Sequence, residues 1–115
     1  MNHFCTISTA SHLYKVQALV ESLRNQQPDF LMHVLVVDDN HNFSSENCKN
    51  WKLSDINSNE NAQAIISKYG NNKDKLRWSL KPVFLKHLLE QETINKLIYL
   101  DNDLYFFSDY RFLFE

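Results

Sequence analysis

The segment Leu31–Val37 limits the possible folds of this chain more than any other segment. Its sequence, Leu-Met-His-Val-Leu-Val-Val, is apolar at every position except His33. A strand with one face in water alternates apolar and polar side chains, whereas a strand covered on both faces is apolar nearly throughout. The segment therefore predicts a strand inside a parallel sheet, where β-branched residues are favoured. Two carboxylates, Asp38 and Asp39, follow it directly.

Predicted helices alternate with predicted strands along the 115 residues. Leu13, Val16 and Leu19 recur at helical spacing, and Gly70 is a candidate C-cap for a later helix. Helices are predicted over residues 13–22, 45–49, 61–69 and 74–88, strands over 4–7, 31–37, 51–53, 96–100 and 105–107, a loop over 56–59, and the first turn of a further helix after 109. This order is typical of one α/β domain with a Rossmann-like, mostly parallel sheet and helices on both faces.

Composition excludes several classes of function. The net charge is −2 and the acidic and basic residues are interspersed, so the sequence predicts no surface for nucleic acid. No apolar run is long enough to span a membrane, and the first residues lack the pattern of a secretory signal. Cys5 and Cys48 lack the spacing of a metal site. These features predict a cytoplasmic protein without a transmembrane segment, with peripheral attachment to a membrane as the alternative.

The tripeptide Asp101-Asn102-Asp103 follows the apolar strand at residues 96–100 and predicts a metal site. Side chains at positions i and i+2 of an extended segment point to the same side, so Asp101 and Asp103 would face one cation while Asn102 turns away. Oxygen ligands favour a hard ion such as Mn²⁺ or Mg²⁺. The alternative is a simple turn, in which Asp and Asn are common residues.

Polar residues follow three of the predicted strands. Ser8 and Thr9 follow the first strand, Asp38 and Asp39 follow the second, and the Asp-Asn-Asp tripeptide follows the last. Ligands of open parallel sheets bind at the carboxyl ends of the strands. We therefore expect these three clusters to meet at one edge of the sheet.

Together these motifs resemble the N-terminal half of a nucleotide-sugar glycosyltransferase with the GT-A fold, in particular the family 8 type. The motifs are Phe4–Thr9 with Tyr14, Ala18–Leu23, the strand ending in Asp38, Leu80-Lys81-Pro82, and Ile98–Asp103. The last of these is similar to the DxD motif of that family. The resemblance implies a single GT-A domain over residues 1–115, apparently truncated after the DxD strand.

The resemblance also implies roles for individual residues. Asp101 and Asp103 would bind Mn²⁺ or Mg²⁺, which bridges the diphosphate of the donor. The donor-binding residues would be Thr6, Ser8, Thr9, Tyr14, Asp38, Asp39, Arg77, Lys81, Asp101 and Asn102. The residues of the first strand would contact the nucleoside, Tyr14 would stack on the base, and the two cations would contact phosphate or sugar.

Alternatives from the residues themselves stay open for five of these side chains. Tyr14 lies in the apolar sector of its predicted helix, so it is a candidate for the core or for a lid. Asp38 and Asp39 are candidates for ordinary solvated loop acids, and Lys81 for a surface lysine whose stem covers apolar neighbours. Arg77 has Asp74 and Glu90 as candidate ion-pair partners.

The expected function is metal-dependent transfer of a sugar from a nucleotide-diphosphate-sugar, expected to be a UDP-sugar, to an acceptor that is a glycan, a lipid or a protein. This chain would supply the donor- and metal-binding half and would be inactive alone, with an apolar patch exposed by its aromatic C-terminal segment. No catalytic residue is predicted. The alternatives are a truncated nucleotide-sugar-binding domain without catalysis and a phosphatase of the haloacid-dehalogenase type.

Overall fold

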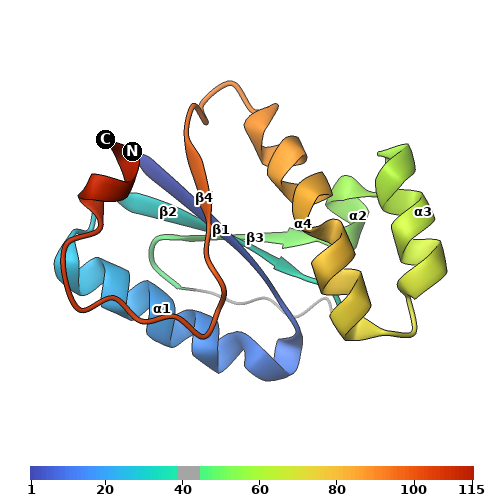
Figure 1. The fold of residues 1–115 in the computed structure, drawn as a ribbon, viewed down its shortest axis with the longest axis horizontal. Coiled ribbons are helices and arrows are strands. Elements are labelled where there is room, and N and C mark those ends of the chain that lie inside the picture. The colour runs from blue at the N-terminus through green and yellow to red at the C-terminus, as the bar shows by residue number, and fades with distance from the viewer. Residues whose placement is uncertain (39–44) are drawn as a thin grey trace.

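The computed structural model describes residues 1–38 and 45–115, which form a twisted sheet with helices on both faces (Figure 1). The strands are β1 (Asn2–Ser8), β2 (Phe30–Val36), β3 (Cys48–Lys52) and β4 (Leu97–Tyr99). All their pairings are parallel and the order across the sheet is β3-β2-β1-β4. The predicted α/β class and parallel sheet are therefore confirmed.

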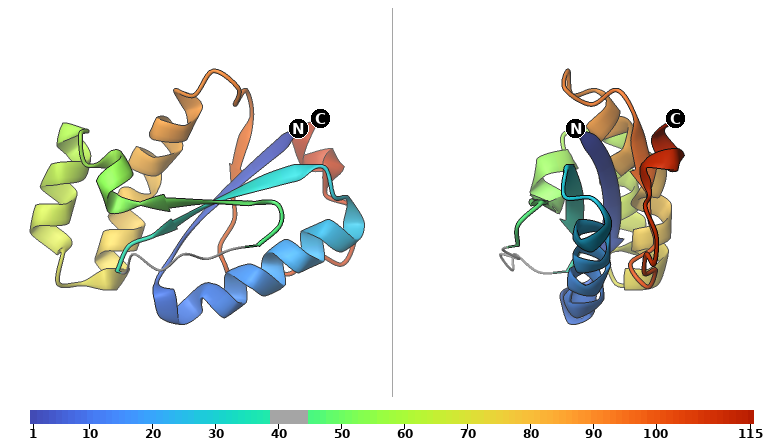
Figure 2. Two further views of the ribbon diagram at one scale, coloured as in Figure 1. Left: turned by 180° about the vertical axis from the view of Figure 1, so that it is seen from behind. Right: turned by 90° about the vertical axis from the view of Figure 1, so that its left-hand side faces the viewer.

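Helices cover the two faces of the sheet unequally, as Figure 2 shows from the side. The helical segments are η1 (Ala10–His12), α1 (Leu13–Gln26), α2 (Leu53–Ile56), α3 (Glu60–Tyr69), α4 (Lys73–Leu89) and η2 (Arg111–Phe114). Helix α1 packs on one face, and α2, α3 and α4 pack on the other. None of the described helices is long and apolar enough to cross a membrane.

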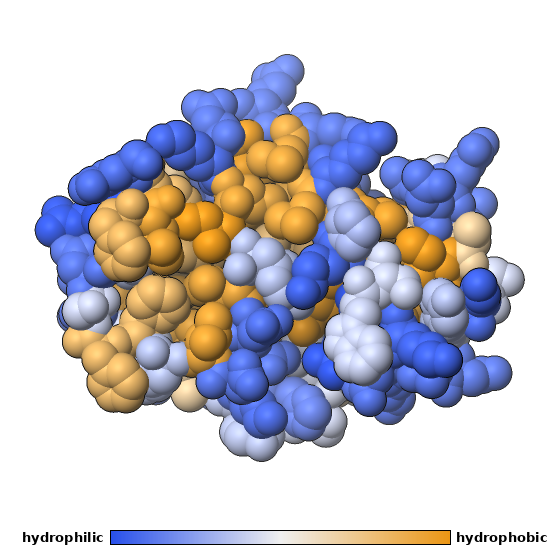
Figure 3. Space-filling model, viewed as in Figure 1, coloured by the Kyte–Doolittle hydropathy of each residue, from blue (hydrophilic) through white to orange (hydrophobic). Residues whose placement is uncertain are grey.

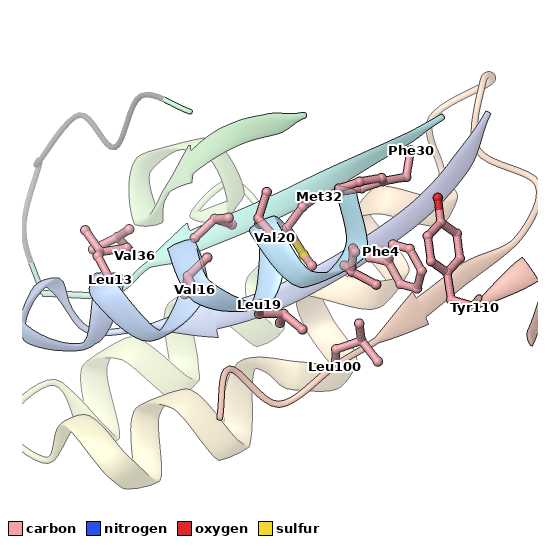
Figure 4. Close-up of a cluster of buried hydrophobic side chains, with 12 residues drawn as sticks. Phe4, Leu13, Val16, Leu19, Val20, Phe30, Met32, Val36, Leu100 and Tyr110 are labelled. Carbon is pink, nitrogen blue, oxygen red and sulfur yellow. The ribbon is translucent and has the colours of Figure 1, made fainter. Parts of the chain in front are cut away.

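Alternating side chains of β1 and β2 divide the core into two clusters. Phe4 and Val34 point toward α1, whereas Cys5 and Leu35 point toward α4. Figure 4 shows the first cluster, in which the apolar stripe of α1 meets the sheet. This explains why the predicted central strand is apolar at nearly every position, because both of its faces are covered.

The segment after β4 returns along α1 and completes the first cluster. The backbone N–H of Phe106 donates to Ser22 Oγ at 3.0 Å, and the hydroxyl of Tyr110 donates to the Gln27 carbonyl at 2.6 Å. The Tyr110 ring is fully buried against Phe4, with 5.2 Å between ring centroids. The aromatic C-terminal segment is therefore partly a component of the core.

Other side chains of the same segment are exposed. These are Leu104, Tyr105, Phe107, Phe112 and Leu113. Figure 3 shows apolar side chains gathered on this face of the molecule, around β4 and the C-terminal segment. The expected apolar patch is therefore present.

Three hydrogen-bonded rings connect β1, β2 and β3. The indole N–H of Trp51 donates to His33 Nδ1 at 3.1 Å, and His33 Nε2 lies 3.0 Å from His3 Nδ1. Because His33 Nδ1 accepts a hydrogen bond, its Nε2 carries the proton and donates to His3. Burial lowers the pKa of His33 to about 4, with smaller contributions from His3 and Lys49. The ring of His33 is therefore neutral at pH 7.

Four predicted elements are wrong or misplaced. Residues 48–52 form β3 rather than the helix predicted over 45–49, because Asn47 (φ 65°) turns the chain and its amide group donates to the carbonyls of Pro28 and Phe30. The strand predicted over 51–53 is thus β3, which begins and ends earlier. The loop predicted over 56–59 starts one residue too early, because residue 56 is the last residue of α2. The Asp55 carboxylate of this helix accepts a hydrogen bond from the Lys52 N–H. Residues 105–107 form no strand, because Phe106 donates to a side chain of α1.

Candidate functional site

The carboxyl ends of β1, β2 and β4 lie at one edge of the sheet, because all three strands are parallel (Figure 1). Ser8 pairs with Val36 at the ends of β1 and β2, and Tyr99 ends β4 one strand away. Polar residues follow each of these ends in the sequence. The predicted meeting of the three polar clusters at one edge is therefore confirmed for their described residues.

A cavity of about 140 Å³ lies at the end of β4. Its lining residues are Ile7, Arg77, Tyr99, Asp101, Asn102 and Asp103. Asp101 and Asp103 are exposed, whereas Asn102 is buried and its amide donates to the Ile7 carbonyl at 3.4 Å. The Leu104 N–H donates to the Asp101 carbonyl at 3.2 Å, which closes a turn. The tripeptide therefore forms a turn and also presents two carboxylates to one cavity.

Arg77 of α4 lines the same cavity as the two carboxylates. Its Nη2 donates to Asp74 Oδ1 at 2.7 Å, so Asp74 and not Glu90 is its partner among the two candidates. The side chain of Arg77 is 20% exposed, and its Nε is buried without a hydrogen-bond partner. A buried donor of this kind is costly to leave unpaired.

Lys81 lies one turn further along α4 and contacts the wall of the cavity. Its Nζ is 4.4 Å from the ring centroid of Tyr99, which is a cation–π contact. Burial raises the pKa of Tyr99, whose ring lines the cavity. Lys81 is therefore held beside the site by a specific contact, rather than extending freely into water.

Asp38 is integrated into the fold and lies apart from this cavity. Its carboxylate accepts from the Ala10 N–H at 2.8 Å and pairs with Lys73 Nζ at 3.0 Å. Burial raises its pKa, but the hydrogen bond from Ala10 and the Lys73 cation outweigh that effect and leave the pKa below its ordinary value. Asp38 lines a second cavity of about 510 Å³ between β2, α2 and α4. Asp39 lies outside the described residues.

The polar residues at the end of β1 are turned inward. Thr6, Ser8 and Thr9 are buried, and the Ser8 hydroxyl donates to the Thr9 carbonyl at 2.8 Å. Thr9 Oγ1 lies 3.1 Å from Ser11 Oγ. The hydroxyls of Ser8 and Thr9 thus bond within the loop, and Thr6 is buried inside β1.

Tyr14 is exposed at the beginning of α1. Its relative exposure is 66%, and its ring contacts that of His12 edge-on with 6.5 Å between centroids. The alternative that placed Tyr14 in the core is therefore wrong. One aromatic face is available for stacking near the carboxyl end of β1.

The donor atoms at the end of β4 fit a hard cation. Two exposed carboxylates give oxygen ligands, and the remaining positions of a six-coordinate ion would go to water and ligand oxygens. Within residues 1–38 and 45–115, no group of three or more His, Cys, Asp or Glu side chains could hold a metal ion. Asp101 and Asp103 would therefore hold such an ion only together with a ligand that supplies further oxygens.

Two residues near this site were not among the predicted site residues. Tyr99 lies two positions before Asp101, so the alternation of a strand could have placed it on the same side. Asp74 lies three positions before Arg77 on a helix, which is the spacing of an ion pair. Both signals were present in the sequence, but only the fold shows that Tyr99 lines the cavity and that Asp74 bonds to Arg77, which lines it.

Comparison with known proteins finds two curated relatives, the uncharacterized proteins YfnD and YfnF of Bacillus subtilis (strain 168). Each is 28% identical to this chain. The match to YfnD covers 111 residues, which is 93% of this chain and 35% of YfnD, and the match to YfnF covers 115 residues, which is 97% of this chain and 38% of YfnF. The chain thus spans little more than a third of the length of these relatives. No protein-family model and no solved structure matches it.

Proposed function

We propose that this chain is the donor- and metal-binding part of a glycosyltransferase with the GT-A fold that uses a nucleotide-diphosphate-sugar, with UDP as the nucleotide. One observation supports this most: Asp101, Asp103 and Arg77 line a single cavity at the carboxyl end of a parallel strand. Carboxylates suit a divalent cation, and a guanidinium suits phosphate oxygens. A diphosphate with a bound cation would use both kinds of side chain, because the carboxylates would bind the cation and the guanidinium would bind phosphate oxygens.

Each side chain has a distinct role in this proposal. Asp101 and Asp103 hold the cation, which when bound supplies Lewis-acid stabilisation of the leaving diphosphate. Arg77 donates to phosphate oxygens, and the Lys81 ammonium, which contacts the Tyr99 ring, adds positive charge near the site. Asn102, anchored to Ile7, fixes the turn that separates the two carboxylates.

The acceptor and the catalytic groups lie outside this proposal. The cavity at the end of β4 is small and open to solvent on the side of its two exposed carboxylates. Transfer to an acceptor requires that water is excluded and that the acceptor is oriented. We therefore expect the 115-residue chain alone to hydrolyse a donor slowly at most, and to catalyse no sugar transfer.

The proposal is tested first by calorimetric titration with UDP in the presence of Mn²⁺ or of excess chelator. UDP affinity should be at least roughly tenfold higher with Mn²⁺, and Asp103→Asn should remove the difference. Asp29→Asn is the matched control, because Asp29 is exposed just before β2, at the opposite edge of the sheet. Equal UDP affinity with and without Mn²⁺ would refute the proposal.

A second test concerns the base. Tyr14→Ala should weaken UDP binding by roughly 1–3 kcal/mol, the usual effect of losing an aromatic ring that stacks on a base. It should leave the melting temperature nearly unchanged, because the side chain is exposed. The affinity for Mn²⁺-pyrophosphate, which has no base, is the internal control. If the variant binds UDP as tightly as the parent, Tyr14 is not part of the donor site.

A further inference from the structure

The two edges of the sheet differ in charge. Strand β3, at one edge, carries two exposed lysines, Lys49 and Lys52, among its five residues. Charged side chains on an edge strand oppose the pairing of that edge with a further strand. Strand β4, at the other edge, has the sequence Leu-Ile-Tyr, which carries no charge, and its three residues are half-buried. Strand β4 therefore lacks the protection that the lysines give to β3.

The backbone of β4 has hydrogen-bonding groups on its outer side. The Leu100 N–H donates to the Cys5 carbonyl at 2.9 Å, so residue 100 faces β1, and by alternation residue 98 also faces β1. The N–H and C=O groups of Leu97 and Tyr99 therefore point away from β1, where none of the described strands pairs with them. These groups are available to a further strand.

Apolar side chains surround this outer side of β4. Leu97 and Tyr99 pack against the core cluster on the α4 face of the sheet, and Ile98 packs against the cluster on the α1 face. Leu104 and Tyr105, which follow the turn after β4, are 44% and 51% exposed. Figure 3 shows apolar side chains gathered around β4 on this side of the molecule. A further strand at β4 would extend both clusters and cover apolar surface.

The charges at the two ends of β4 indicate which strand fits there. Lys96 precedes β4, Asp101 follows it two residues after its end, and both side chains are exposed. Two copies of β4 in antiparallel orientation would bring Lys96 of each copy near Asp101 of the other, whereas a parallel orientation would bring like charges together. A two-fold axis produces the antiparallel orientation and makes the same contact twice. Strand β4 is therefore complementary in charge to a second copy of itself.

We propose that two copies of this chain form a dimer in which their β4 strands pair antiparallel across a two-fold axis. The outward backbone groups of Leu97 in one copy bond to those of Tyr99 in the other, and Ile98 lies at the axis. Lys96 and Asp101 form an ion pair at each end, and the two four-stranded sheets become one. This inference concerns association of the chain and does not depend on the proposed function.

The first test is sedimentation velocity of the chain over a range of concentrations, without nucleotide or metal. Because β4 has only three residues, we expect a reversible dimer with a dissociation constant of roughly 10 μM. Leu97→Pro removes an outward N–H at the first residue of the strand, where proline is tolerated, and should raise this constant at least roughly tenfold. Leu104→Lys should have a similar effect, because it places a charge on the apolar surface.

Ala64→Lys is the matched control, because it adds the same charge at an exposed position of α3, which packs against α4 on one face of the sheet. Its dissociation constant should stay within about twofold of the parent value. Thermal unfolding followed by circular dichroism shows whether each variant keeps its fold. A variant that has lost its fold is replaced by the charge variants below, which change only exposed side chains.

A charge exchange tests the antiparallel orientation. Lys96→Glu should weaken the dimer several-fold, because it puts two carboxylates together at each end of the pair. Adding Asp101→Lys to the same chain should restore the affinity, because each new glutamate then meets a lysine of the other copy. The two positions lie at opposite ends of one strand, so a contact within a single copy does not explain such a rescue.

Three outcomes would overturn the inference. The first is a chain that stays monomeric at concentrations well above the expected dissociation constant, which would leave this surface to a different partner. The second is a dimer that folded Leu97→Pro and Leu104→Lys do not weaken, because it would form elsewhere on the molecule. The third is a failure of the charge exchange to rescue Lys96→Glu, because the antiparallel pair would then be wrong.

Discussion

The ends of β2 and β4 have similar sequences and different structures. Each strand is apolar and each is followed by carboxylates. At the end of β2, Asp38 accepts from Ala10 and pairs with Lys73, and its side chain is only 12% exposed. At the end of β4, Asp101 and Asp103 are exposed and line a cavity with Arg77. A carboxylate after a parallel strand is therefore either a structural link or a candidate ligand, and its neighbours decide which.

The difference follows from the elements that lie next to each strand end. The end of β2 is close to the loop after β1 and to the first residue of α4, which supply a backbone donor and a cation. The turn after β4 lies at the edge of the sheet, where β1 is the one neighbour of β4 among the described strands. Stability should therefore depend on Asp38, and ligand binding should depend on the turn.

Acid titration should give the largest effect, which comes from His33 and is shared by the parent and the carboxylate variants. The pKa of His33 is about 4 in the folded chain and ordinarily 6.5, so the unfolded state binds more protons between these values. Stability should fall by about 3 kcal/mol from pH 7 to pH 4 in the parent and in every carboxylate variant. Urea denaturation at a series of pH values measures this loss.

The same titration compares the two strand ends below pH 4. The pKa of Asp38 lies below its ordinary value of 3.8, so its contribution is present above that pH and is lost as the pH falls further. Asp38→Asn should lack this second loss, and Asp103→Asn should retain it. If the loss instead disappears in Asp103→Asn, the turn after β4 is the structural link and the comparison is reversed.

Removing the carboxylate of Asp38 altogether should have the next largest effect. Asp38→Ala leaves the Ala10 N–H without its charged acceptor, and we expect the free energy of unfolding to fall by about 2 kcal/mol. The ion pair adds little, because Lys73 is 62% exposed. Lys73→Gln is the control for that pair and should cost well under half as much. Chemical denaturation at pH 7 measures both variants.

The smallest effect is expected at the end of β4. Asp103→Asn should change the stability of the ligand-free chain by no more than about 0.5 kcal/mol, since exposed substitutions rarely do more. A slight gain is the expected direction, because two nearby carboxylates repel each other without a cation. A loss comparable to that of Asp38→Ala would show that both strand ends are structural.

Most elements of the fold could be predicted because burial leaves a clear pattern in their sequences. The apolar run at 31–37 identified β2, and the spacing of Leu13, Val16 and Leu19 identified α1. Strand β3 could not be predicted well, because it is an edge strand with mixed polarity. Its position depends on pairing with β2 and on the bonds of Asn47 to Pro28 and Phe30, which no local pattern reveals.

The candidate site was predictable in part for the same reason. Spacing was sufficient to place Asp101 and Asp103 at one cavity, but the extended geometry behind that prediction is wrong, because residues 102–103 form a turn and Asn102 lines the same cavity. The inward turn of Ser8 and Thr9 depends on the geometry of one loop, and the partner of Asp38 comes from a helix 35 positions later in the sequence. Such long-range partners cannot be identified from residue types alone.

The hydrogen bond from Asn102 to the Ile7 carbonyl has a consequence for the order in which the chain folds. It joins residues 95 positions apart, and the nearby bonds from Phe106 to Ser22 and from Tyr110 to Gln27 span 84 and 83 positions. Contacts between residues so distant in sequence form slowly, because a long loop must close first. The β1–β2 unit can form early during synthesis, whereas the candidate site can assemble only after synthesis has passed Asp103.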